Sequence, residues 1–435
     1  MMIPPTVQSP YHKQKTHPMN KVFSVILLSL AIISSCKKSE PAGTEPGTDP
    51  VISGIPAVYV ELTGEVIPGQ KEDRLGCTVK IVDQDNSEIL SSAGGIRLRG
   101  NGTRYLEKSP YDLKLDKKES VLGMPKDKRW VLLANYLDRT SLRNDVGMEI
   151  ARRARGMAWN PKGEFVSLYY GGQYRGLYYL CEKIKISKDR VNIDELTVDD
   201  IEEPELTGGY LLEFDNNEDE KIYWTDLFKY PVKIKEPDEA TDVQATYILG
   251  YLNSLESVLT DEKRIAQHEY EDYIDVESFI DWWLTGEIVM CKDYNTPGSV
   301  FMYKERSGKL FAGPIWDLDL YTFSSDVHDI NNFLLNGSVY YSALLKDTKF
   351  RDAVKQEWKK LKTDLENGFS FYDYIDARSK LIEEEIARDD NLYPNRTYSY
   401  ILSGDEYESF RTAVEIMKSF LKARIAALDI LIGKI

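Results

Sequence analysis

Residues 293–319 read DYNTPGSVFMYKERSGKLFAGPIWDLD, and this stretch decides which fold we expect. Asp293 follows an apolar run with helical spacing. Two strand-like segments come next, separated by a Ser-Gly turn at residues 307–308, which is typical of a β-hairpin. Asp317 and Asp319 follow the second segment at positions i and i+2. We therefore predict a helix, an acidic residue, a hairpin and an acid pair in that order.

Asp293 and Asp317 have the order and spacing of the two aspartates in kinase-type phosphoryl transfer. In such sites one Asp orients the attacking hydroxyl, and a second Asp beyond a hairpin holds Mg²⁺ against the phosphates. The two residues stand 24 positions apart. Hard cations prefer carboxylate oxygens, so Asp317 and Asp319 form a candidate Mg²⁺ or Ca²⁺ site. A turn with capping aspartates is the alternative, and nucleotide chemistry is the first hypothesis.

The start of the chain has the features of an export signal. Met19-Asn20-Lys21 precedes an apolar run over residues 22–33, and Ser34-Ser35-Cys36 follows it. A short positive segment, a short apolar segment and small residues are typical of a signal peptide, and the ending ISSC resembles a bacterial lipobox. We expect residues 1–35 to be a signal peptide with its true start at Met19, and Cys36 to carry a lipid. A plain signal peptide or an N-terminal anchor helix is the alternative.

Residues 36–53 contain many Pro, Gly, Ser, Thr and Glu residues and are expected to form a flexible tether. No later apolar run is long enough to cross a bilayer, so we expect membrane contact through the lipid anchor only. The predicted location is the cell envelope, as a lipoprotein anchored to the outer membrane. The sequence leaves open whether it faces the periplasm or the outside.

Composition narrows the possible classes of function. The formal net charge is −16, and without residues 1–35, which hold three Lys and no acids, 52 basic and 71 acidic residues leave −19. This charge argues against a nucleic-acid partner, whose phosphates need a basic face. Cys77, Cys181 and Cys291 lack the pattern of a disulfide framework or a zinc site. Only two His residues lie beyond the signal peptide, so a Ser-His-Asp hydrolase or a His-ligated metal is poorly supplied.

The chain is β-rich first and helical afterwards. Short aromatic or β-branched runs between Gly or Asn turns fill residues 54–237, with one helix near residues 141–155. Runs with helical spacing dominate residues 238–435. We therefore predict an α+β protein with a β-rich N-terminal lobe and a helical C-terminal lobe, divided at residue 237. Kinase-like folds have this layout, although other α+β proteins share it.

The first lobe holds candidate phosphate-binding groups. RLRGNGT and, after a short loop, KSPYDLKL form two strand-like segments around a glycine turn. Such turns bring backbone N–H groups onto phosphates, so Arg99, Gly100 and Gly102 are candidates. Lys114 shares one face of the second strand with Asp112 and could point into a cleft. The alternative is an ordinary hairpin with solvated Lys and Arg side chains.

Glu182 and Glu213 are candidates for the acidic partner of that lysine. Glu182 follows an apolar strand, and Glu213 lies within another one. A carboxylate in such a strand usually faces solvent, and this is the alternative for both residues.

Six motifs follow one another along the chain. They are RLRGNGT (97–103), KSPYDLKL (108–115), LLANYLDRTSLRN (132–144), GLYYLCEK (176–183), GGYLLEFD (208–215) and GPIWDLD (313–319). Together they resemble the CotH (spore coat protein H) kinase family, over about residues 55–430. The resemblance implies an atypical protein-kinase-like fold. It also implies ATP-dependent protein phosphorylation with a divalent metal, Mg²⁺ or Mn²⁺.

The resemblance also implies roles for individual residues. By position, Asp293 resembles the catalytic Asp of the family, and Asp317 resembles its metal-binding Asp. Lys114, or as second choice Lys108, resembles the lysine that contacts the phosphates. Kinases also place an Asn a few residues after the catalytic Asp to hold a second metal. Asn295 is the candidate here, but it stands too close, and a glycine occupies the matching position.

Two functions from different classes follow from these observations. The first is an ATP-dependent kinase that phosphorylates Ser or Thr of an unknown envelope or extracellular protein. The second is a non-catalytic binding or adhesion protein on a kinase-like scaffold. The pair Asp293 and Asp317 favours the kinase. The displaced Asn and a location in which ATP is scarce favour the binding protein.

Overall fold

The computed structural model describes residues 54–64, 74–324, 328–367, 370–394 and 409–435. The predicted signal peptide, Cys36 and the tether lie outside these ranges, so their assignment stays a prediction. By its internal contacts the chain from residue 52 to its end forms a single unit. No helix within the described ranges is long and apolar enough to cross a membrane.

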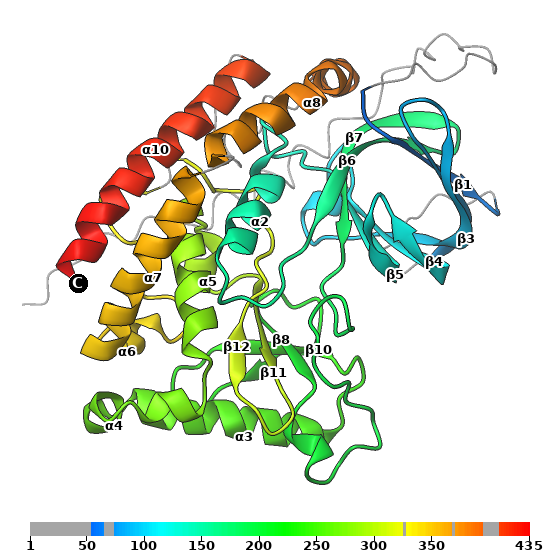
Figure 1. The fold of residues 1–435 in the computed structure, drawn as a ribbon. Coiled ribbons are helices and arrows are strands. Elements are labelled where there is room, and N and C mark those ends of the chain that lie inside the picture. The colour runs from blue at the N-terminus through cyan, green and yellow to red at the C-terminus, as the bar shows by residue number, and fades with distance from the viewer. Residues whose placement is uncertain (1–53, 65–73, 325–327, 368–369, 395–408) are drawn as a thin grey trace, which may run out of the picture. The chain divides into compact units, whose positions relative to one another are not determined.

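Within the described residues, seven strands close into a barrel (Figure 1). In barrel order they are β1 (Ala57–Leu62), β2 (Leu75–Val82), β3 (Glu88–Leu98), β4 (Tyr111–Val121), β5 (Met124–Leu133), β7 (Gln173–Glu182) and β6 (Gly163–Tyr170). Parallel pairing of β1 with β6 closes the ring, and the other neighbours are antiparallel. Alternate side chains such as Val58, Val60 and Leu113 belong to one buried apolar cluster of the barrel, because successive strand residues face opposite sides.

A second sheet of the described chain has five strands, in the order β12, β11, β8, β10, β9. Their bounds are β8 (Tyr210–Phe214), β9 (Tyr223–Trp224), β10 (Pro231–Glu236), β11 (Val300–Lys304) and β12 (Leu310–Ala312). The hairpin expected after Asp293 is present as β11 and β12. Because β11 also pairs with β8, the sheet combines strands from both sides of residue 237. The predicted lobe boundary therefore does not separate the two sheets.

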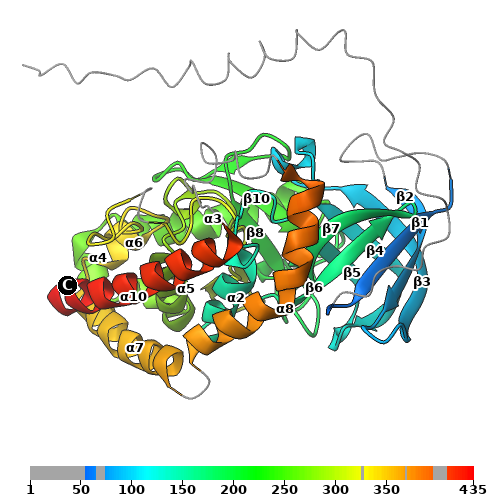
Figure 2. The same ribbon diagram turned by 90° about the horizontal axis from the view of Figure 1, so that it is seen from above.

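The helices of the described residues lie between and after these strands along the chain. They are α2 (Arg143–Arg153), α3 (Asp242–Leu259), α4 (Glu262–Ala266), α5 (Val276–Val289), α6 (Tyr341–Leu344), α7 (Thr348–Glu366), α8 (Phe371–Leu392) and α10 (Phe410–Lys434), with the 3₁₀ turns η3 (Thr103–Tyr105), η4 (Glu205–Thr207), η5 (Glu269–Asp272) and η6 (Asp293–Asn295). Figure 2 shows α8 alongside the barrel, where it packs against β7.

Helix α5 is the central helix and leads into the predicted acidic site. Asp275 caps its N-terminus by accepting a hydrogen bond from Ser278 N at 2.8 Å. Its side chains are buried on nearly all sides, and it packs against α2, α7, α10 and β12. At its end Met290 has φ +51°, a left-handed conformation that commonly terminates helices. The chain then turns toward Asp293.

The sheets and helices confirm the predicted α+β class. The first seven strands of the β-rich segment, β1 to β7, form a closed barrel, which the strand spacing did not indicate. Closure depends on the pairing of β1 with β6, which places Ala57 opposite Ser167. Such long-range pairing leaves no local signal in the sequence. The kinase-like arrangement of the lobes stays a prediction.

Candidate active site

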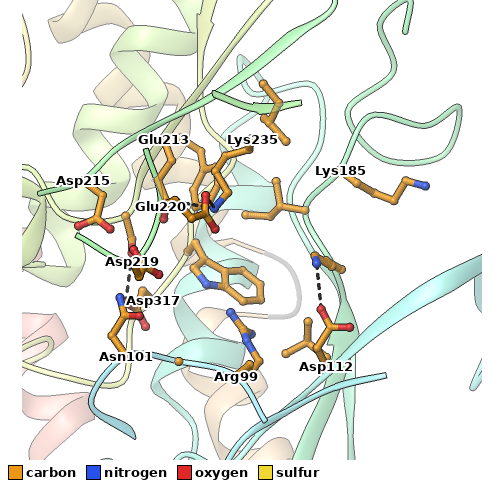
Figure 3. Close-up of a pocket in the computed structure, with 18 of the residues that line it drawn as sticks. Arg99, Asn101, Asp112, Lys185, Glu213, Asp215, Asp219, Glu220, Lys235 and Asp317 are labelled. Atoms are coloured by element: carbon orange, nitrogen blue, oxygen red, sulfur yellow. Dashed lines mark hydrogen bonds and ion pairs between the residues drawn. The ribbon is translucent and has the colours of Figure 1, made fainter. Parts of the chain in front are cut away.

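A cavity of about 1200 Å³ lies between the barrel and the second sheet. On the barrel side it is lined by residues of β3, β4 and β5, by the segment after β7 and by the glycine turn. On the other side it is lined by β8, β10, β11 and the segment after β12. Figure 3 shows labelled side chains around this cavity, including Arg99, Asp112, Asp215 and Asp317. Several residues that the sequence singles out therefore meet at one place.

Asp293 and Asp317 are brought together by a contact between their neighbours. The hydroxyl of Tyr294 donates a hydrogen bond to the carbonyl of Trp316 at 2.5 Å and accepts one from Trp316 N at 3.1 Å. Tyr294 is fully buried, so this junction is sealed from water. The turn η6 and the segment after β12 are thereby fixed to each other. The two predicted aspartates are therefore neighbours in the fold, although Asp317 lines the cavity and Asp293 does not.

The backbone around Asp317 is held in an uncommon conformation. Asp317 has φ +63°, in the left-handed region that residues other than Gly seldom adopt. On its C-terminal side Leu318 N donates to the Asn144 side chain at 2.9 Å. The Leu318 side chain lies against Gly147, where a Cβ would come within 2.1 Å of it. Strained residues that are fixed from both sides cluster at functional sites, so Asp317 is a strong site candidate.

Asp317 lies at this end of the cavity and raises the pKa of its acidic neighbours Asp293 and Asp319. Burial and then the neighbouring Asp317 raise the pKa of Asp293 to about 6. Burial and then Asp317 raise the pKa of Asp319 to about 7. Burial also raises the pKa of Asp317, although Arg99 lowers it. The Asp317 side chain is open to the cavity, but it lies deep enough for the surrounding protein to disfavour its charge. Like charges gathered in this way favour binding of a cation.

The donor set fits a magnesium ion that binds together with phosphates. No three His, Cys, Asp or Glu side chains within the described residues form a ready-made metal cage. Mg²⁺ commonly uses only one or two carboxylates and takes its remaining ligands from waters and substrate phosphates. Asp317 and Asp319 both line the cavity and can supply those carboxylates. The two residues therefore suit a Mg²⁺ ion that is held by one or two carboxylates together with waters and phosphates.

The opposite wall of the cavity is basic and centres on a buried carboxylate. Asp112 is 4% exposed. It has four cations within 4 Å, namely Arg74 at 2.5 Å, Lys183 at 2.9 Å, Arg129 at 3.5 Å and Arg97 at 3.9 Å. Burial alone would raise the pKa of Asp112, but Lys183 and Arg74 hold it well below its usual range. One carboxylate cannot neutralise four cations, so this wall carries surplus positive charge.

The glycine turn lies between the acidic wall, formed by Asp317 and Asp319, and the basic wall around Asp112. The guanidinium of Arg99 stacks over the Trp316 ring at 5.0 Å. Gly100 has φ +81°, and a Cβ at this position would come within 2.3 Å of the Thr103 hydroxyl. Arg99, Gly100 and Gly102 all line the cavity, as predicted. Arg99 is thus fixed beside the residue that precedes Asp317.

Three other predicted residues lie away from the open cavity. Lys114 is exposed on β4 and does not line it. Glu182 is buried outside the lining, where it accepts a hydrogen bond from Lys162 N at 3.0 Å. Asn295 is exposed in η6 and does not line the cavity either. The structure therefore does not bring these three residues together with Asp317.

Two predicted residues line the cavity but already have strong partners. Glu213 forms an ion pair with Lys235 at 3.2 Å, and burial raises the pKa of Glu213. Lys108 forms a buried ion pair with Asp389 at 2.8 Å. The ammonium group of Lys108 is therefore bound to Asp389 and does not make the phosphate contact expected of it.

The sequence reasoning did not assign Asp112, Lys183 or Asp215 to the site. Lys183 lies within the motif GLYYLCEK, but its partner Asp112 comes from another motif 71 positions earlier. Asp215 directly follows β8 and pairs with Lys233 at 2.7 Å. It also raises the pKa of Asp293, which places it near the acidic wall. The motifs themselves can be recognised in the sequence, but the contacts between residues of different motifs cannot.

Comparison with known proteins agrees with the motifs. A family model described as CotH kinase protein matches residues 96–428. This range includes every residue that lines the cavity and, among the described helices, all but the end of α10. No curated protein matches the chain.

Proposed function

Since the chain belongs to the CotH kinase family, we propose that it is a protein kinase that uses ATP. It transfers phosphate, with Mg²⁺ or Mn²⁺, to a Ser or Thr hydroxyl of another protein. The observation that carries the proposal is a single cavity lined on one side by Asp317 and Asp319 and on the opposite side by basic residues, with Asp293 near enough to Asp317 for their charges to interact. A metal-bound polyphosphate has this charge pattern, with a cation at one end and uncompensated anionic oxygens at the other.

The acidic residues have separate roles in this proposal. Asp317, with Asp319 beside it, would hold the divalent ion, which supplies neutralisation of the phosphate charge. Asp293 lies on η6, joined to the same site through Tyr294. It would accept a hydrogen bond from the acceptor hydroxyl and orient it toward the phosphate. Because its pKa is raised to about 6, Asp293 can also take up the hydroxyl proton near neutral pH.

The basic wall would bind the phosphates. Lys183, Arg129 and Arg99 line the cavity and come from the segment after β7, from β5 and from the glycine turn, respectively. Lys183 takes the place that the resemblance suggested for Lys114, which is exposed elsewhere on β4. Backbone N–H groups at Gly100 and Gly102 would add neutral donors to the same phosphates.

The location of the reaction belongs to the same proposal. Cys36 and the preceding signal would deliver the protein to the cell envelope and anchor it by a lipid. The acceptor would then be an envelope or extracellular protein.

Transfer of labelled phosphate from ATP tests the proposal. The purified protein is incubated with Mg²⁺ or Mn²⁺ and an envelope extract, beside Asp317→Asn and Asp293→Asn. Label that appears with the natural protein and is lost in both variants supports the kinase. Lys114→Met is the matched control, because Lys114 is exposed away from the cavity and its loss should leave the label unchanged.

A non-catalytic binding protein on the same scaffold is the second candidate. Asn295, the only residue suggested for a second metal, is exposed outside the cavity lining, which favours this function. Absence of labelled product, together with retained binding of an envelope partner by Asp317→Asn, would select it.

A further inference from the structure

Lys108 and Asp389 form an ion pair that is closed off from water. Both side chains are 0% exposed, and Lys108 Nζ lies 2.8 Å from Asp389 Oδ1 and 3.0 Å from Oδ2. The ammonium group also donates to the carbonyl of Leu177 at 2.5 Å and lies 5.0 Å from the centre of the Tyr178 ring. A buried charge pair is tolerated only where its geometry and additional hydrogen bonds offset the loss of water. This pair meets that condition.

The barrel is shaped to receive the Asp389 carboxylate. Leu177 N donates to Asp389 Oδ1 at 2.9 Å. Gly176 lies beside it with φ +101°, and a Cβ there would come within 2.0 Å of the same oxygen. Any side chain at residue 176 would therefore displace the carboxylate. The position is built for Asp389, which comes from helix α8.

The pair connects α8 to the segment that carries the glycine turn. This segment, residues 99–110, is a closed loop, because Arg99 N donates to the carbonyl of Pro110 at 3.1 Å. Lys108 lies near its end, and the hydroxyl of Tyr178 donates to the carbonyl of Ser109 at 2.9 Å. The loop is thus fixed at one end to β7 and, through Lys108, to α8.

The next residue of α8 supports a second edge of the cavity. Arg139 binds both oxygens of Asp390, at 2.8 and 2.9 Å. Arg139 belongs to the segment that contains the cavity-lining residues Asn135, Tyr136 and Asn144. Neighbouring residues at the end of α8 therefore contact two cavity-lining segments.

From these contacts we propose that Asp389, acting through Lys108, is a positioning residue that fixes the glycine loop for nucleotide binding. Lys108 is then a support of the loop and does not bind phosphate itself. The proposal rests on the proposed function where it concerns the nucleotide. Its structural part, that α8 immobilises residues 99–110, stands without that function.

The test compares two double variants that remove one ion pair each from α8. Lys108→Met with Asp389→Asn removes both buried charges and keeps an acceptor for Leu177 N. Lys418→Met with Asp376→Asn removes the pair at 2.6 Å that joins α8 to α10. The second variant is the matched control, because it changes the same helix without touching the barrel.

Two readouts are measured on each folded variant: amide hydrogen exchange over residues 99–110 and binding of Mg²⁺-ATP by calorimetry. For the Lys108 and Asp389 variant we expect both to change by about tenfold or more, with faster exchange in the loop and a higher Kd. Exchange in α5 and β11 should stay as in the natural protein. In a transfer assay KM should rise while kcat changes little, a split that mere loss of stability would not produce. The control variant should match the natural protein in all of these.

Three results would overturn the positioning role. The first is a folded variant with unchanged exchange in residues 99–110, and the second is changed exchange with unchanged nucleotide affinity. The third is tighter nucleotide binding by the single variant Asp389→Asn, since that would show that Asp389 withholds Lys108 from the phosphates. If the natural protein binds no nucleotide, the proposed function fails, and the exchange measurement alone decides whether α8 fixes the loop.

Discussion

The two walls of the cavity have an excess of opposite charge. On the basic wall four cations surround the single carboxylate of Asp112. On the acidic wall Asp317 raises the pKa of its neighbour Asp319 and of Asp293 nearby, and the cations that oppose these shifts are Arg99, Lys292 and Arg143. Neither wall is neutral by itself. A folded protein that keeps two such walls apart is arranged to receive a ligand that carries both charges.

The largest expected effect comes from removing the acidic wall's central carboxylate. Asp317→Asn keeps the size of the side chain but loses the charge that would hold the divalent ion. We expect the rate of phosphate transfer to fall about a thousandfold or more, because charge neutralisation dominates this chemistry. Steady-state kinetics with Mg²⁺ measures it. Transfer within tenfold of the natural rate would show that the acidic wall is not the metal site.

On the basic wall, loss of the central carboxylate should lower the stability of the fold. Asp112→Asn leaves four cations without their shared buried carboxylate, and we expect a loss of about 3–5 kcal/mol in the free energy of unfolding. The pKa of Asp112 is lowered in the folded protein, so its stabilisation is present above the unfolded pKa and is lost as pH falls through the folded value. Urea unfolding should therefore show a constant difference between the two proteins above about pH 5, which shrinks in stronger acid. An equal difference at every pH would contradict the ion-pair explanation.

Lys183 separates ligand binding from folding on the same wall. In Lys183→Met, Asp112 keeps Arg74, Arg97 and Arg129, so the fold should persist. We expect the Kd of Mg²⁺-ATP to rise about 10- to 100-fold, because a charged hydrogen bond contributes about 1.5–3 kcal/mol. Lys114→Met is the control and should bind as the natural protein does. The reverse result would return the phosphate role to Lys114.

The smallest expected effect is a shift of thermal stability with pH and metal. The pKa values of Asp293 and Asp319 are raised to about 6 and about 7, so the folded protein holds protons that the unfolded chain releases. Stability without metal should therefore fall as pH rises from 5 to 8. Mg²⁺ or Mn²⁺ should restore it, raising Tm by about 2–4 °C at pH 8 and less at pH 5. Differential scanning calorimetry measures both trends, and a metal effect that is larger at pH 5 would contradict them.

The two walls also differ in how well the sequence predicts them. Asp293, the hairpin and Asp317 follow one another within 24 residues, so local spacing was enough to place them together. Lys183 reaches Asp112 only because β5 pairs with β4 on one side and with β7 on the other. No local pattern encodes that order of strands. The basic wall therefore became visible only in the folded structure.

Lys114 lies outside the cavity because of its position along β4. Asp112 and Lys114 do lie on the same face of β4, as alternation predicts. Two residues nevertheless span about 7 Å along a strand. Asp112 lies at the end of β4 that borders the cavity, whereas Lys114 lies beyond it in solvent. Alternation gives the face of a strand, but the position of a cavity along it depends on the second sheet.

Calorimetric titration of ATP into the natural protein, with and without Mg²⁺, tests most directly whether the two walls serve one ligand. We predict saturable binding of one ATP that requires Mg²⁺ or Mn²⁺, is lost in Asp317→Asn, is weakened in Lys183→Met and is unchanged in Lys114→Met. ATP binding that ignores both the metal and Asp317, or no binding at all, would contradict the account.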